Sequence, residues 1–251
     1  MSLDGHDKFC GFQKSMFPLA IYGGQDTYSG RINFLRIWTI NNDPKIIGRF
    51  YFDYLFDNKV LCERHRIDRG TETGILSTIH VYLLNKLGGG NEDDPIDSII
   101  HGPSTENKIE RWWRELHHRL EKYFKQQLAG LLENGQYDPG NKLHRNTLAY
   151  IYIPMLQKEL DTFRITVWNN SRGRYQDEKE LPSGVPKLIY HFPEKYNGEK
   201  CGRTITEENL EEVAEVSDMI IYLQIFVENA NKLLKTQRIL NLMMLLKDLS
   251  F

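Results

Sequence analysis

The sequence predicts an α/β protein with a five-stranded mixed sheet flanked by helices and a helical C-terminal extension. Three observations carry this prediction. Short apolar segments with turn residues between them dominate the first 40 residues. Helical and strand-like patterns then alternate up to about residue 124, and only helical patterns follow. A meander of three strands followed by alternating helices and strands is typical of a mixed sheet covered on both faces.

The N-terminal elements follow from local patterns. We expect strands over residues 3–9, 17–22 and 31–38, of which the last partly alternates, with a glycine-rich turn over residues 23–30. Asp43 followed by Pro44 is a typical helix start. A strand over residues 60–68, a helix over about 72–87 and a short strand over residues 96–100 complete the order βββαβαβα.

The helix expected next carries the clearest pattern in the chain. Its apolar residues recur at three and four positions, as on a helix packed against a core, with Ser104 or Thr105 as the cap. This stripe comprises Ile109, Trp112, Trp113, Leu116, Leu120, Tyr123 and Phe124. Glu110 lies beside the stripe, four residues before Arg114, and an ordinary ion pair on a solvated face is one interpretation of that spacing. We expect both tryptophans to belong to the core.

The second half of the chain is predicted to be helical. A helix is expected over residues 144–163, an extended connector over 181–186 and further helix over 206–249. We therefore divide the chain into a core over residues 1–130, a helical extension over 131–200 and a C-terminal helical segment over 201–251.

Composition limits the classes of function. A net charge of −2 and a pI of about 6.5 give no overall attraction to nucleic acid, so any DNA-binding surface must be local. Cys10, Cys62 and Cys201 are far apart and form no Cys-x-x-Cys pair, which argues against a zinc knuckle or a disulfide framework. No apolar run reaches the roughly 20 residues that span a bilayer. We expect an intracellular protein, in the nucleus rather than the cytoplasm.

Three carboxylates lie at or near the strand ends of the predicted sheet, where active sites of α/β proteins usually form. Asp4 lies on the first strand, Asp68 ends the fourth, and Glu110 begins the helix after the fifth. Three anions close together repel one another unless a divalent ion neutralises them, and Mg²⁺ or Mn²⁺ suits such oxygen ligands. Two such ions about 3.5–4 Å apart would serve phosphoryl transfer, as in a nuclease or a strand transferase.

Five segments in the same order resemble the integrase core domain of animal, transposon-derived proteins, which are relatives of retroviral integrases with a ribonuclease-H-like fold. They are LDGHDK at residues 3–8, GQDTYS at 24–29, NNDPK at 41–45, RIDRGTE at 66–72 and GPSTENKIERWW at 102–113. The resemblance covers roughly residues 1–200. It implies Mg²⁺-dependent DNA cleavage and strand transfer, which together achieve DNA integration.

The resemblance also assigns residues. Asp4 matches the first catalytic and metal-binding aspartate of this D,D,E family, Asp68 the second, and Glu110 the glutamate. Asp26 matches an aspartate that is usually structural and is kept as the fallback ligand, with Asp7 as a further candidate. This chain has Lys108 where the family usually has Gln. It also starts at the first strand, without the upstream DNA-binding region expected of a mobile-element enzyme.

Local charge suggests two partners. Asn107, Lys108, Arg111 and Arg114 would bring a polar and basic face to DNA beside the acidic residues. Residues 194–218 carry eight acidic and three basic side chains and could bind another protein. The rival to an active enzyme is therefore a domesticated, catalytically inactive domain that binds nucleic acid or protein. A homo-oligomer is compatible with either.

Overall fold

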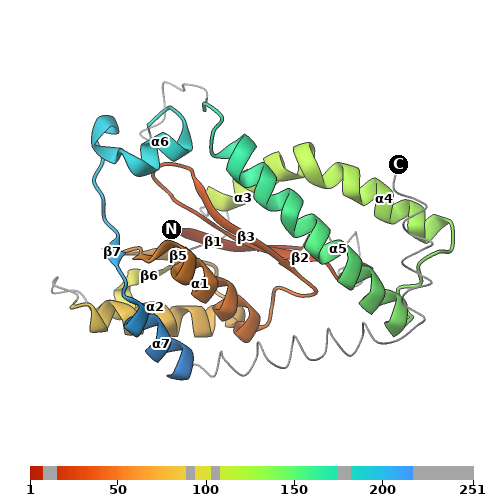
Figure 1. Cartoon of the computed structure of the whole chain (residues 1–251), viewed down its shortest axis with the longest axis horizontal. Helices are drawn as coiled ribbons and strands as arrows, with labels where there is room; N and C mark the ends of the chain where they lie inside the picture. The colour runs from red at the N-terminus through yellow and green to blue at the C-terminus, as the bar shows by residue number, and fades with distance from the viewer. Residues whose placement is uncertain (8–15, 89–93, 103–107, 174–181, 217–251) are drawn as a thin grey trace.

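The computed structural model describes residues 1–7, 16–88, 94–102, 108–173 and 182–216. Its centre is a five-stranded sheet in the order β3-β2-β1-β5-β6, with helices on both faces (Figure 1). The strands are β1 (Ser2–His6), β2 (Ala20–Gln25), β3 (Ile32–Trp38), β5 (His65–Ile67) and β6 (Ile99–His101). The predicted α/β class with a mixed sheet is confirmed.

The register of the sheet puts β1 at its centre. β1 runs antiparallel to β2, with Asp4 opposite Gly23, and parallel to β5, with Ser2 opposite Arg66. β2 and β3 are antiparallel, as a meander requires, and β5 and β6 are parallel. The expectation that the strand before Asp68 neighbours the first strand is therefore confirmed.

The single strand predicted over residues 60–68 is wrong. Val60–Leu61 forms β4, which pairs antiparallel with β7 (Arg203–Thr204) in a separate two-stranded sheet, and only His65–Ile67 joins the main sheet. The chain changes sheets between these strands. Glu63 stabilises this corner because its two carboxylate oxygens accept hydrogen bonds from the guanidinium group of Arg203, at 2.9 and 3.0 Å.

One face of the sheet is covered by α1 (Pro44–Asn58), α2 (Gly74–Lys86) and α7 (Glu207–Val216). Asp43 caps α1 as predicted, since its side chain accepts a hydrogen bond from the backbone N–H of Lys45 at 2.9 Å. The 3₁₀ turn η2 (Thr71–Thr73) leads into α2, and η3 (Pro95–Ser98) precedes β6. The core on this face includes Leu3, Tyr22, Phe34, Ile47, Leu55, Ile67, Leu76, Leu83 and Leu210.

The opposite face is covered by α3 (Lys108–Leu116), α4 (Lys122–Glu133) and α5 (Lys142–Thr162) (Figure 1). A π-helical turn, η5 (His117–Glu121), joins α3 to α4, and another, η6 (Phe163–Trp168), follows α5. The predicted core positions of Trp112 and Trp113 are confirmed, because their exposed fractions are 2% and 4%. The chain then forms α6 (Pro186–His191) and the 3₁₀ turn η7 (Pro193–Tyr196) before β7.

Some expectations lie outside the described residues. These are the helix cap at Ser104 or Thr105, the position of Asn107 and the helix beyond residue 216. Within the described part of the chain, no helix is both long and apolar enough to cross a membrane.

Candidate functional site

Asp4 lies on the central strand and points to the face covered by α3. Trp113 of α3 donates a hydrogen bond from Nε1 to Oδ2 of Asp4 at 2.8 Å, and its ring stacks on His6 with 4.7 Å between centroids. Side chains alternate along a strand, so Asp4 and His6 share this face while Leu3 packs into the core on the other. Gly23, opposite Asp4, makes room for the indole: a Cβ there would lie 3.1 Å from Cη2 of Trp113.

A cavity of about 220 Å³ opens beside Asp4 at the carboxyl ends of β1 and β5. Asp68 follows β5 directly, and Glu72 lies in η2 just beyond it. The cavity thus brings together carboxylates from segments far apart in the sequence. Its lining residues are Leu3, Asp4, Gly5, Asp7, Tyr22, Asn41, Asn42, Asp68, Glu72 and Thr73.

The electrostatics of the cavity disfavour additional negative charge. Burial, followed by the charges of Asp68 and Glu110, raises the pKa of Asp4 from 3.8 to about 7, although the hydrogen bond from Trp113 opposes the shift. Burial and the charges of Asp4, Glu72 and Asp68 also raise the pKa of Tyr22 well above its ordinary value. A carboxyl group with a pKa of about 7 is only partly ionised near neutral pH.

Glu110 lies in the first turn of α3 and is half-buried. It does not line the cavity, but its charge acts on Asp4 and raises the pKa of that residue. Glu110 and Arg114 form no ion pair with each other in the described part of the chain, so the ordinary helix-surface interpretation has no contact to support it. The charge of Glu110 acts instead on Asp4 and disfavours the ionised form of that residue.

Asp26 occupies a different place. Its Oδ2 accepts hydrogen bonds from the backbone N–H and the hydroxyl of Ser29, at 2.8 and 2.6 Å, and so holds the turn between β2 and β3. It lines a separate, larger cavity and not the one that holds Asp4 and Asp68. Asp7, in contrast, lines the cavity with Asp4.

A buried ion pair fixes the end of β1 against the helices. Glu121, in η5, is fully buried, and its Oε1 lies 2.5 Å from Nε2 of His6. Its Oε2 lies 3.0 Å from Nδ1 of His117 and 3.8 Å from Nζ of Lys125. Burial opposes ionisation, but the hydrogen bonds from His6 and His117 and the charge of Lys125 outweigh it and lower the pKa of Glu121. The pair holds His6 and therefore supports the stacked Trp113.

The predicted DNA-binding residues are only partly described. Arg111 and Arg114 are exposed on α3, the helix that carries Glu110. The side chain of Lys108 and the whole of Asn107 lie outside the description. Sequence reasoning did not single out Trp113 or Glu72 as site residues. Glu72 follows the Gly-Thr pair just after Asp68, and this proximity was the available signal.

The donor types of the cavity fit a hard divalent cation, but in the described part of the chain the carboxylates of Asp4, Asp68 and Glu110 do not converge within the reach of one ion. Within the described part of the chain the buried Oδ1 of Asp68 has no hydrogen-bond partner, and burial together with neighbouring charges raises the pKa of Asp4 beside it. Carboxylate oxygens, with an asparagine pair in the same lining, are the ligand types that Mg²⁺ and Mn²⁺ prefer. A cation here would satisfy the unpaired oxygen and neutralise the repulsion.

The sheet order, with helices on both faces and carboxylates at the ends of adjacent central strands, defines a ribonuclease-H-like α/β protein. A scan against family models matches the model described as Integrase core domain over residues 2–185, and the chain therefore belongs to the integrase core domain family. The matched region contains Asp4, Asp68 and Glu110. No curated protein and no solved structure was found to match the chain.

Proposed function

We propose that this protein is a metal-dependent polynucleotidyl transferase that cleaves DNA and transfers DNA strands, with Asp4, Asp68 and Glu110 as its metal-binding catalytic residues. One observation carries the proposal. Burial, followed by the charges of Asp68 and Glu110, raises the pKa of Asp4 to about 7, beside a buried oxygen of Asp68 that lacks a hydrogen-bond partner in the described part of the chain. Mobile-element ancestry and a nuclear location belong to the same proposal.

The chain's own residues have distinct tasks in this proposal. Trp113 donates a hydrogen bond to Oδ2 of Asp4 at 2.8 Å and so fixes the orientation of this carboxyl group. Asp68 offers its unpaired Oδ1, and Glu110 approaches from α3. Mg²⁺ bound there would polarise a phosphodiester and the attacking hydroxyl or water. The carboxylates would hold that ion, and the His6–Glu121 pair fixes η5, which follows α3, against β1.

DNA would approach along the exposed side of α3. Arg111 and Arg114 lie three residues apart on α3, and both are exposed. Guanidinium groups bind phosphate oxygens and set the register of a duplex without reading its sequence. Asn107 and Lys108 extend the same surface in the sequence. The basic side chains would offset the repulsion between the acidic cavity and the phosphate backbone.

The test is cleavage of labelled duplex DNA ends with Mg²⁺ or Mn²⁺, by the parent protein and by single-residue variants. Glu110→Gln and Asp68→Asn should abolish nicking and strand transfer while circular dichroism and thermal unfolding show a folded protein. Glu115→Gln, on the same helix but paired at the surface with Arg119, is the matched control and should retain activity. Asp26→Asn tests the fallback ligand and should also retain it. Metal-independent cleavage, or activity that survives Glu110→Gln, would overturn the assignment.

The alternative is a domesticated domain without catalysis. One observation favours it: Glu207, Glu208, Glu211 and Glu215 form an exposed acidic face on α7, while Leu210 and Val213 bury the other face. Such a face suits a basic protein partner. If the folded parent protein binds Mn²⁺ but cleaves no DNA end, this alternative replaces the enzymatic proposal.

A further inference from the structure

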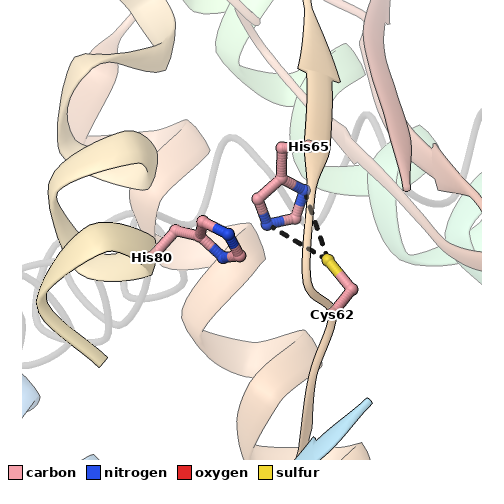
Figure 2. Close-up of side chains that lie close together, drawn as sticks. All are labelled: Cys62, His65 and His80. Carbon is pink, nitrogen blue, oxygen red and sulfur yellow. Dashed lines mark hydrogen bonds between the residues drawn. The ribbon is translucent and has the colours of Figure 1, made fainter. Parts of the chain in front are cut away.

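A second cluster of metal-binding side chains lies away from the carboxylates. Cys62 follows β4, His65 begins β5 and His80 lies in α2, and the three side chains converge between the strand and the helix (Figure 2). One donor atom from each lies within 4.8 Å of the donor atoms of the other two. The two imidazole rings are 3.9 Å apart between centroids.

The spacing of the sulfur and nitrogen atoms fits a tetrahedral ion. Sγ of Cys62 lies 3.6 Å from Nδ1 and 3.5 Å from Nε2 of His65. Zinc bonds of about 2.3 Å to sulfur and 2.05 Å to nitrogen, at a tetrahedral angle, separate S and N by about 3.6 Å. The sulfur is nearly equidistant from the two nitrogens, so a common ion would require the Cys62 side chain to turn toward one of them.

Tyr51 of α1 orients both imidazoles. Its hydroxyl lies 2.8 Å from Nε2 of His65 and 2.9 Å from Nδ1 of His80. These contacts leave Nδ1 of His65 and Nε2 of His80 as the nitrogens that Tyr51 does not engage. Nε2 of His80 is buried, and a hydrogen bond to the backbone of Glu63 also acts on this ring. Metal-binding histidines commonly hold their second nitrogen in a hydrogen bond, and Tyr51 supplies that support here.

Both imidazoles are fully buried. Neutral imidazole is the form that ligates metals. Cys62 reaches solvent through the lining of a cavity of about 990 Å³, bounded by parts of α1, β4, β7 and residues 189–204. The cluster therefore combines a buried, oriented donor pair with an open side through which an ion can enter.

We propose that Cys62, His65 and His80 bind one zinc-type divalent transition-metal ion, with its fourth coordination position open to the cavity. One thiolate and two imidazoles select Zn²⁺ or Co²⁺ over Mg²⁺, which prefers oxygen ligands. The bound ion would link the corner between β4 and β5 to α2. It shares no ligand with the carboxylate cavity, so binding does not depend on the proposed DNA chemistry.

Cobalt is the direct probe, because Co²⁺ in a tetrahedral thiolate site absorbs visible light and gives a sulfur-to-metal charge-transfer band. Full-length protein freed of metal with a chelator and titrated with Co²⁺ should develop both absorptions with one equivalent per chain. Excess Zn²⁺ should abolish them. Zn²⁺ should also raise the thermal midpoint of the parent protein.

Variants assign the band to its ligands. Cys62→Ser should remove the charge-transfer band, and His80→Gln should remove or strongly weaken the visible absorption. Cys201→Ser is the matched control, since Cys201 is an exposed thiol that lines the same cavity but lies outside the cluster, and it should keep both absorptions. Glu110→Gln should keep them too.

The parent protein decides the question even if a variant unfolds. If no charge-transfer band forms in folded, reduced parent protein, the three side chains are a hydrogen-bonded packing cluster and the proposal fails. A band that persists in Cys62→Ser places the ion elsewhere and equally overturns it.

Discussion

Trp113→Phe tests the side-chain hydrogen bond that lowers the pKa of Asp4. The substitution removes the Nε1–H that donates to Oδ2 of Asp4 at 2.8 Å but preserves an aromatic ring to stack on His6. Trp112→Phe is the matched control. Trp112 is the adjacent residue and is equally buried, but its Nε1 has no hydrogen-bond partner, so its removal should leave Asp4 unaffected.

The size of the effect follows from the bond. A hydrogen bond to a charged group contributes about 1.5–3 kcal/mol, and a pKa change of one corresponds to 1.36 kcal/mol. Losing the bond should therefore raise the pKa of Asp4 from about 7 to between roughly 8 and 9. Near pH 7 the ionised fraction of Asp4 would fall from about a half to roughly 1–10%, and apparent Mg²⁺ affinity would fall about 5- to 50-fold.

Two measurements follow the change. Carbon-detected NMR of the aspartate carboxyl groups, titrated without metal, gives the pKa of Asp4 directly, and calorimetry near pH 7 gives the Mg²⁺ affinity. The loss of affinity in Trp113→Phe should shrink as the pH rises above the new pKa, because the defect is one of protonation. An unchanged or lower pKa of Asp4 in Trp113→Phe, or an equal rise in Trp112→Phe, would refute the reasoning.

Three further perturbations test other parts of the molecule. The folded-state pKa of Asp4 lies above its ordinary value of 3.8, so its contribution to stability is present below about pH 4 and is lost as the pH rises through about 7. Asp4→Asn should consequently raise the free energy of unfolding of the metal-free protein near pH 8, measured in urea, by up to about 4 kcal/mol, and should flatten this pH dependence. Equal free energies of unfolding for the variant and the parent protein at that pH would contradict the assigned pKa. Glu121→Ala leaves buried His6 unpaired and should cost about 3–5 kcal/mol, whereas Glu115→Ala, at an exposed helix pair, should cost less than about 1 kcal/mol. Arg111→Ala should weaken DNA binding similarly for all sequences and reduce the salt dependence, d log K/d log[salt], by about 0.9; an unchanged slope would remove Arg111 from the DNA surface.

Local signals in the sequence predicted the frame of this fold. Asp43 and Pro44 specify the start of α1 through a cap and a fixed φ, which depend only on neighbouring residues. The stripe containing Ile109 and Trp112 specified the buried face of α3 because its periodicity is a property of the helix itself. Both predictions are confirmed for α1 and α3, but Tyr123, a later member of the predicted stripe beyond the π-helical turn η5, is 59% exposed.

The polar contacts of the site could not be predicted from local sequence patterns, because they depend on the tertiary structure. The stripe on α3 predicts that Trp113 is buried, but it does not say where the indole N–H points. That direction depends on Gly23, on another strand, which leaves space for the ring beside Asp4. The division of the strand predicted over residues 60–68 likewise depends on pairing with β7, about 140 residues later in the sequence. A local pattern cannot contain such information.

The Cys62–His65–His80 cluster could not be predicted from local sequence patterns either. Cys62 and His65 are three residues apart, but the third donor comes from α2, and only the packing of α1 and α2 against β5 brings it close. The absence of a Cys-x-x-Cys pair therefore argued only against a zinc knuckle. It left open a site assembled from three elements.

Strand alternation also separates the two groups of possible ligands. Asp4 shares its face of β1 with His6, against α3, whereas His65 contacts Tyr51 of α1 and His80 of α2 on the opposite face of the sheet. The carboxylate cavity offers oxygen donors, and the second cluster offers sulfur and nitrogen donors. The oxygen donors would therefore select a hard ion such as Mg²⁺, and the sulfur and nitrogen donors a softer ion such as Zn²⁺. The two kinds of ion would not compete for one set of ligands. Loss of Mg²⁺-dependent chemistry and loss of thiolate-bound metal should then be separable by single substitutions, because neither donor group contributes an atom to the other.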